Sequence, residues 1–105
     1  MKNDNLKLRT KQFALRIIRM VVKLPESPES RIIGNQILRS ATSVAANYRA
    51  CCLAKSKRDF INKLKIVEEE ADETILWLEL MEDLEYFDAE KIGPIQKEAR
   101  EIFCG

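Results

Sequence analysis

The chain has 105 residues, of which 46% are hydrophobic and 33% are charged, with only three glycines and three prolines. This composition favours one domain of helices joined by short turns, and it disfavours an all-β fold, which needs many turns. No apolar run is long enough to span a membrane, and residues 1–10 lack the apolar core of a secretion signal, so we expect a cytoplasmic protein with no membrane partner.

The sequence contains no histidine and three cysteines. Without histidine it lacks the commonest general base and the usual zinc ligand. Cys51 and Cys52 are adjacent and cannot easily bridge to each other, so we expect them and Cys104 to be free thiols. With no base to activate these thiols, we predict a protein that is not an enzyme and that holds no cofactor and no metal.

The net charge of +1 conceals a strong asymmetry along the chain. Residues 1–65 hold 15 Lys and Arg against 4 Asp and Glu, a net charge of +11. Residues 66–105 hold 3 against 13, a net charge of −10. Either the two segments pair with each other, or the basic segment faces a polyanion.

The first predicted helix covers about 5–24 and is capped by Asp4 or Asn5. Its apolar arc is broad and contains Leu6, Phe13, Ile17, Val21 and Leu24, with Leu15, Ile18 and Val22 beside them. Opposite the arc lies a basic stripe of Arg9, Gln12, Arg16, Arg19 and Lys23, and no acidic residue occurs between Asp4 and Glu26. The stripe is either a solvated face, which pairs with acidic helices in an assembly, or a binding strip for a polyanion.

A second helix is predicted over about 28–54. Pro25 ends the first helix, Ser27 caps the second, and Pro28 takes its first position. Small residues are frequent along it, which predicts close packing at the centre of a bundle. We expect the Asn47 amide to meet the carboxylate of Glu70 or Glu73 in a structural polar clasp.

The third helix, about 57–87, organises the predicted fold and starts with Ser56 as cap and Asp59 in a capping box. One apolar seam contains Phe60, Leu64, Val67, Ala71, Thr74, Leu78 and Met81. A second contains Ile66, Glu70, Glu73, Trp77, Leu80, Leu84 and Phe87. Two seams need partners on two sides, so we expect copies of the chain to associate. The Glu70 and Glu73 pair has the spacing of bundle metal sites but lacks their histidines.

Basic residues crowd the start of that helix at Lys55, Lys57 and Arg58, where they oppose the helix dipole. This cluster predicts an acidic neighbour or an external anion. A fourth helix is predicted over about 89–103, capped by Asp88 and apolar at Ile92, Ile95, Ala99, Ile102 and Phe103. Because Pro94 removes a backbone donor, we expect this helix to be kinked or to start late.

Three stretches carry a resemblance to a known family. They are Leu38 to Arg49 (LRSATSVAANYR), Ala54 to Leu64 (AKSKRDFINKL) and Glu70 to Leu80 (EADETILWLEL), and they fill much of the middle of the chain. In order and spacing they resemble the small helical proteins encoded by intervening sequences in bacterial large-subunit ribosomal RNA genes. The accessory variability determinants of diversity-generating retroelements belong to the same superfamily.

The resemblance implies an all-α, antiparallel up-down-up-down four-helix bundle that assembles into a ring-like homo-oligomer, a homopentamer in the family. It also implies a positively charged surface and, in the retroelement branch, an adaptor that binds a reverse transcriptase and nucleic acid. The sequence departs from the family pattern at Ala45, often Gly, at Ala50, often Glu, and in the acidic run 68–70. Added negative charge weakens a phosphate-directed interaction.

Two functions follow as expectations. The first is a non-enzymatic oligomeric adaptor in which Arg9, Arg16, Arg19 and Lys23, with Lys55, Lys57 and Arg58, contact RNA or DNA phosphates. No aromatic residue interleaves with these positions in the sequence, so this binding is expected to tolerate any base sequence without base stacking. The alternative is a structural protein–protein interaction module, with no nucleic-acid binding, whose basic and acidic segments pair within the assembly.

Overall fold

The computed structural model describes the backbone of residues 2–104 and the side chains of residues 5–102. This part of the chain forms four helices and no strand: α1 (Lys2–Val21), α2 (Pro28–Cys52), α3 (Lys57–Asp83) and α4 (Ala89–Cys104). The prediction of an all-α protein is confirmed. Among the described residues, no helix combines the length and the apolar character that a membrane crossing requires.

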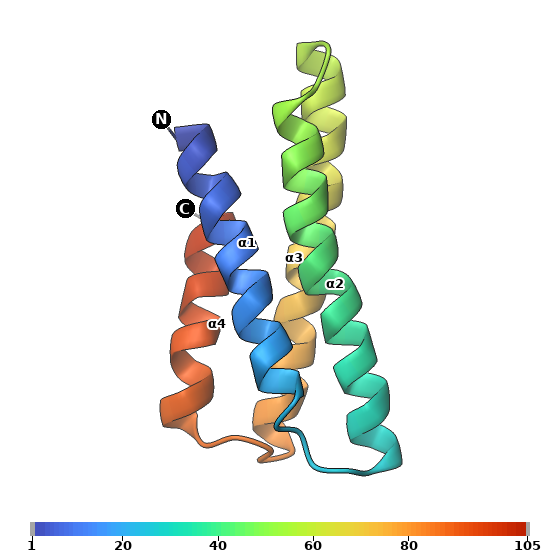
Figure 1. Cartoon of the computed structure of the whole chain (residues 1–105), viewed down its shortest axis with the longest axis vertical. Coiled ribbons are helices and arrows are strands. Elements are labelled where there is room, and N and C mark those ends of the chain that lie inside the picture. The colour runs from blue at the N-terminus through green and yellow to red at the C-terminus, as the bar shows by residue number, and fades with distance from the viewer. Residues whose placement is uncertain (1, 105) are drawn as a thin grey trace.

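The helices pack side by side, and the chain reverses its direction at each connection (Figure 1). α1 packs against α2 and α4, and α3 packs against the same two helices, with the most extensive contact between α2 and α3. These two are also the longest helices, so their shared end projects beyond the ends of α1 and α4 (Figure 1). The molecule measures 44 × 24 × 18 Å, and the α2–α3 connection lies at the opposite end of the long axis from the other two connections.

Two hydrophobic clusters hold the helices together. The larger one is built by all four helices and includes Phe13, Ile17, Ile37, Leu78, Met81 and Ile92, each at most 1% exposed. The smaller one holds the projecting end of α2 and α3 and contains Val44, Tyr48, Cys51, Val67 and Ala71. The first predicted seam of α3 therefore supplies buried residues to both clusters.

Most of the second predicted seam of α3 is covered by this chain itself. Trp77, Leu80 and Phe87 pack against the larger cluster, and an arginine of α2 binds the two glutamates of the seam. Ile66 and Leu84 remain 42% and 48% exposed. The seam thus leaves less apolar surface for another copy than its pattern predicted.

α1 begins at Lys2, before the predicted caps, so Asn5 lies inside the helix; the side chain of Asp4 is outside the described residues. The helix ends at Val21 and its last turn tightens, with Lys23 N–H on Met20 O (3.0 Å) and Leu24 N–H on Val21 O (3.1 Å). Only part of the predicted apolar arc is buried: Leu15, Ile18 and Val22 are 37%, 39% and 80% exposed. With Leu8, at 53%, they leave an exposed apolar stripe on this helix.

Both predicted caps of the two long helices are present. The Ser27 hydroxyl accepts the Ser30 N–H (3.2 Å), and Pro28 is the first residue of α2. The Ser56 hydroxyl accepts the Asp59 N–H (3.0 Å) at the start of α3. The Asp59 carboxylate accepts the Lys55 N–H (3.2 Å), one residue before the cap, so the predicted reciprocal bond is displaced by one position.

α3 ends at Asp83, four residues before the predicted end at Phe87. Its C-terminus closes with two bonds, from Tyr86 N–H to Met81 O and from Glu85 N–H to Glu82 O, both 3.0 Å. Glu85 adopts a left-handed conformation with φ 59°, which places it at the position that glycine usually takes in this motif. The helix stops without a glycine, so no residue type in the sequence indicates its end.

α4 begins where it was predicted, with the Asp88 carboxylate accepting the Lys91 N–H (3.1 Å). It continues through Pro94 to Cys104, so the helix does not start late. Pro94 lies in the second turn, where the bond it removes is one of the first in the helix. The predicted apolar side chain of Phe103 lies outside the described residues.

Candidate nucleic-acid interface

The structure separates Arg9 from the other cations of the predicted basic stripe. Arg9 binds Glu98 of α4 with two hydrogen bonds, from Nη2 to Oε1 (2.9 Å) and from Nε to Oε2 (3.2 Å). Glu101 lies 3.8 Å from the same guanidinium. The hydrogen bonds to Glu98 raise the pKa of Arg9. Its charge is therefore neutralised within the chain.

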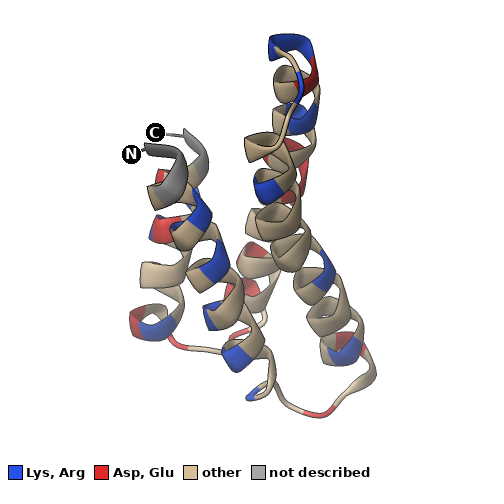
Figure 2. Ribbon diagram, turned by 45° about the horizontal axis from the view of Figure 1, so that its top comes forward, with Lys and Arg blue, Asp and Glu red and all other residues tan. Residues whose placement is uncertain are grey.

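Arg16, Arg19 and Lys23 are exposed, and no hydrogen bond or ion pair within residues 5–102 engages them. They lie along one side of a shallow hollow of about 340 Å³, and Lys91 of α4 lines it as well. Met20, Phe87 and Ile95 supply its apolar surface. We call this site, where α1, α4 and the α3–α4 connection meet, the α1–α4 hollow. Figure 2 shows the Lys and Arg positions as blue bands along α1.

The sequence did not predict Phe87 or Lys91 as partners of the stripe. Both lie more than 60 positions after Lys23, and Phe87 was assigned to the apolar seam of a longer α3. The turn of the chain at the α3–α4 connection brings them to α1 (Figure 1). To predict that Phe87 and Lys91 lie beside α1, one would need to know how the helices pack and where α3 ends.

The second predicted basic cluster lies elsewhere. Lys55, Lys57 and Arg58 are exposed at the α2–α3 connection, at the far end of the long axis from the α3–α4 connection (Figure 2). Asp59, in the same stretch, binds Lys63 at 2.6 Å, and no carboxylate among residues 5–102 pairs with the side chains of Lys55, Lys57 and Arg58, so an anionic neighbour for this cluster stays a prediction. The hydrogen bond with Lys63 holds the pKa of Asp59 below its ordinary value. The seven predicted cations therefore form three groups, with Arg9 paired.

A further basic surface was not singled out from the sequence. Lys7 and Lys11 of α1 and Arg49 of α2 surround the exposed Leu8 in an open depression of about 270 Å³. These cations come from two helices that pack together, so no regular spacing in the sequence indicates that they lie close to one another. They extend the positive surface of α1 towards α2.

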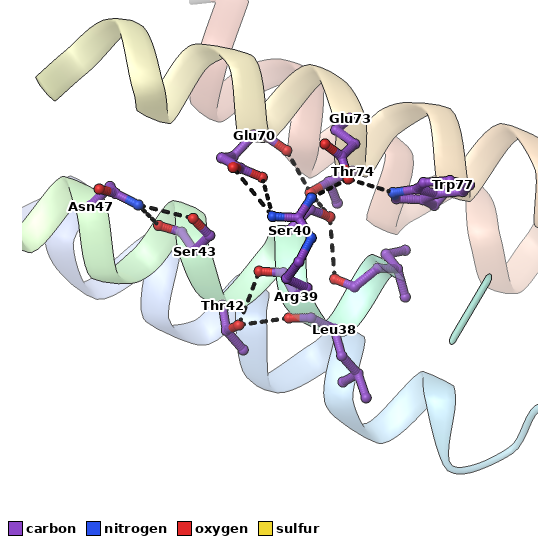
Figure 3. Close-up of polar contacts among 11 residues, drawn as sticks. Leu38, Arg39, Ser40, Thr42, Ser43, Asn47, Glu70, Glu73, Thr74 and Trp77 are labelled. Atoms are coloured by element: carbon purple, nitrogen blue, oxygen red, sulfur yellow. Dashed lines mark hydrogen bonds and ion pairs between the residues drawn. The ribbon is translucent and has the colours of Figure 1, made fainter. Parts of the chain in front are cut away.

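The polar clasp between α2 and α3 exists, but Arg39 makes it (Figure 3). The Arg39 guanidinium donates to Glu70 Oε1 at 3.1 Å and also to Glu73. Trp77 Nε1 donates to the same Glu73 carboxylate at 3.2 Å. The hydrogen bond from Arg39 holds the pKa of Glu73 below its ordinary value. A charged donor satisfies the two glutamates better than an amide could.

The prediction that Asn47 meets Glu70 or Glu73 is wrong. Its Nδ2 donates to the carbonyl and to the hydroxyl of Ser43, both at 2.9 Å, on its own helix (Figure 3). The side chain thus returns to the preceding turn, as short polar side chains often do. Of the three predicted clasp residues, only Glu70 and Glu73 come together.

Close packing of α2 against α3 is visible directly beside the clasp. Ser40 and Thr74 are both 0% exposed, and the Thr74 hydroxyl lies 2.7 Å from the Ser40 hydroxyl (Figure 3). The Ser40 hydroxyl also reaches Ile37 O (3.3 Å), so the pair has partners inside the interface. Small side chains at this point let the two helices approach.

The cysteines offer no activated nucleophile among the described residues. Cys51 is buried and Cys52 half-buried, and both are free thiols as predicted; the side chain of Cys104 lies outside the described residues. Burial raises the pKa of the Cys51 thiol and so lowers its thiolate fraction. Residues 5–102 also contain no group of three side chains suited to hold a metal.

Both the sequence and the structure of the chain have matches among known proteins. Residues 4–103 match the model of a family described as 23S rRNA-intervening sequence protein. The chain is also similar to the crystal structure of a protein with unknown function from the S23 ribosomal protein family of Bacteroides thetaiotaomicron, with 39% identity and a TM-score of 0.91. That alignment covers 99% of this chain and 93% of the other. A comparison with curated proteins gives no match.

Proposed function

The chain belongs to the family of 23S rRNA-intervening sequence proteins, and from this premise we propose that it is a non-enzymatic adaptor that binds nucleic-acid phosphates. The proposed binding surface is centred on Arg16, Arg19, Lys23 and Lys91. Lys55, Lys57 and Arg58 form a second contact at the other end of the molecule. We place this adaptor in the cytoplasm, and in a retroelement setting its protein partner would be a reverse transcriptase.

One observation carries the proposal: four cations surround a single hollow, and no acidic side chain among residues 5–102 lines it. Some cations elsewhere are engaged by carboxylates, as Arg9 is by Glu98 and Arg39 is by Glu70 and Glu73. An isolated concentration of positive charge attracts a polyanion and repels other cations. Phosphate groups are the matching ligand, and their binding releases counterions.

We also propose that the antiparallel four-helix bundle assembles into a ring-like homo-oligomer, with a pentamer favoured by the family resemblance. The exposed stripe of Leu8, Leu15, Ile18 and Val22 on and just after α1 supports self-association. A contiguous apolar face on a small protein typically marks an interface. The stripe adjoins the basic residues of α1, so association would leave the α1–α4 hollow at the edge of the contact.

The competing proposal is a structural interaction module that binds no nucleic acid. The pairs Arg9–Glu98 and Arg39–Glu70 favour it, because each joins a cation of residues 1–65 to an acid of residues 66–105. In this case the free cations of α1 would meet the acidic outer face of α3 in a neighbouring copy. That face carries Glu68, Glu69, Asp72, Glu79, Glu82 and Asp83.

The test is a titration of RNA at about 50 mM and about 200 mM salt, with the assembly mass measured in parallel. If four phosphates are contacted, affinity should fall by roughly 50-fold to 150-fold between the two conditions. The R16E/R19E variant should lose binding and keep its mass, whereas R31E/K97E, with the same charge change outside the hollow, should keep both. Binding that is absent at low salt or independent of salt contradicts the proposal, and an R16E/R19E variant that falls to monomers supports the structural module.

A further inference from the structure

The α1–α4 hollow combines two kinds of surface that phosphate binding alone does not need. Four cations line it, Arg16, Arg19, Lys23 and Lys91. The other lining residues are apolar: Met20, Phe87 and Ile95. A phosphate backbone contacts cations without an apolar surface, so the apolar part of the lining fits a second part of the ligand.

Phe87 is held in place by ordered turns on both sides. On one side, the C-terminal motif of α3 is closed by the bond from Tyr86 N–H to Met81 O (3.0 Å). On the other, the Asp88 carboxylate caps α4 through the Lys91 N–H (3.1 Å). The ring itself packs against the larger hydrophobic cluster. An aromatic side chain with its backbone fixed in this way can receive a flat partner at little entropic cost.

The carboxylates nearest to the hollow in sequence, Asp88 and Glu90, do not line it. Asp88 follows Phe87 directly and accepts the Lys91 N–H at the helix start. Farther along the contact between α1 and α4, Glu98 is engaged by Arg9. The lining of the hollow therefore combines four cations with apolar side chains and contains no carboxylate from residues 5–102.

We infer that the α1–α4 hollow receives one base of a single-stranded nucleic acid against Phe87, while its cations hold the flanking phosphates. This inference rests on the proposed function and narrows its ligand to single strands. In a duplex the bases are stacked and paired, so they cannot enter the hollow; in a single strand they are free to stack on aromatic side chains.

The size of the hollow favours a base over the apolar face of a partner helix. At about 340 Å³ it accommodates one ring system and part of its backbone. A helix bound in a groove needs several anchors at helical spacing along an extended apolar channel. The exposed apolar stripe of α1 could serve a helix, but Leu15, Ile18 and Val22 do not line the hollow.

The test compares three RNA probes of equal length: a twelve-residue poly(U) strand, a strand of the same backbone without bases, and a duplex. The wild type should bind poly(U) about tenfold more tightly than the strand without bases, because the baseless strand cannot stack on Phe87. It should also prefer poly(U) to the duplex. The F87L variant should bind poly(U) and the baseless strand equally, and F87Y should restore the preference. Thermal unfolding of both variants checks that the fold is retained.

The probe comparison on the wild type does not depend on any variant folding. Equal affinity for poly(U) and the baseless strand overturns the inference while the proposed function stands, provided that binding weakens with salt. Tighter binding to the duplex overturns it in the same way. If none of the three probes binds at low salt but an acidic amphipathic peptide does, both the inference and the proposed function are wrong.

Discussion

The contact between α2 and α3 and the contact between α1 and α4 use their charges in opposite ways. Between α2 and α3, Arg39 binds both glutamates that face it, and the buried hydroxyls of Ser40 and Thr74 meet across the interface. Between α1 and α4, Arg9 is paired with Glu98, but the cations farther along α1 are not paired within the described part of the chain. The first contact is closed by its own side chains, and the second opens into a charged hollow.

The difference shows where this fold has capacity to bind something else. α2 and α3 are the longest helices; they are capped and closely packed, and Arg39 pairs with the glutamates that face it across their contact. The four cations of the hollow are not required by any contact among the described residues. Charged side chains that no contact within the chain engages are available to attract a ligand of opposite charge.

The largest expected effect is a loss of stability, and it compares how tightly side chains pack at the centre of the bundle and at the α1–α4 hollow. Ile37 of α2 is 0% exposed, so Ile37→Ala should lower the free energy of unfolding by about 2–5 kcal/mol, because the variant buries less apolar surface and leaves a closed cavity in the core. Ile95→Ala at the α1–α4 hollow should cost less, because the space it leaves opens to solvent. Urea unfolding of both variants measures the difference, and an equal decrease would show that the hollow is as tightly packed as the centre of the bundle.

A smaller and opposite effect is expected at the connection that holds Phe87. Glu85 has a left-handed backbone, which is costly for any residue with a Cβ, so Glu85→Gly should raise the free energy of unfolding by about 1 kcal/mol. Glu79→Gly, inside α3, should lower it by about the same amount. Thermal unfolding measures both. If Glu85→Gly lowers the free energy of unfolding, the Glu85 side chain stabilises the fold by more than the left-handed conformation of this residue costs.

The smallest effect concerns the clasp and depends on pH. Because Arg39 lowers the pKa of Glu73 in the folded state, the carboxylate contributes stability above its ordinary pKa of 4.5, and this contribution is lost as the pH falls below that value. Arg39→Gln should therefore lower the urea midpoint slightly at pH 7, and the difference from the wild type should shrink at pH 3. Arg31→Gln, an exposed cation of the same helix, is the control. If the urea midpoints of Arg39→Gln and the wild type differ equally at pH 7 and pH 3, the ion pair with Glu73 is not the cause of the difference.

Local sequence signals predicted the four helices and most of their starts. Ser27, Ser56 and Asp88 each cap a helix as expected, because a cap depends on residues within one turn. The end of α3 was missed because Glu85 takes a conformation that its side chain does not indicate. The apolar arc of α1 was predicted too broad, since periodicity cannot distinguish a buried Ile17 from an exposed Ile18 at the edge of the same arc.

Only the part of the candidate site that lies on or just after α1 could be predicted from the sequence. The stripe on α1 identified Arg16, Arg19 and Lys23, because residues of one helix face share a local spacing. It could not show that Arg9 is engaged by Glu98 or that Phe87 lines the hollow, since both neighbourhoods arise from residues more than 60 positions away. The same limit explains the clasp, where Arg39, eight positions before the proposed Asn47, reaches the glutamates.

The most direct test of the account is the salt dependence of binding to a poly(U) strand by the wild type and by the R16Q/R19Q variant. Removing one cation that binds a phosphate should reduce the slope of log affinity against log salt by about 0.7, so the variant should show a slope smaller in magnitude by about 1.4. The R31Q/K97Q control should keep the wild-type slope. An R16Q/R19Q slope equal to that of the wild type would contradict the claim that the α1–α4 hollow is where nucleic acid binds.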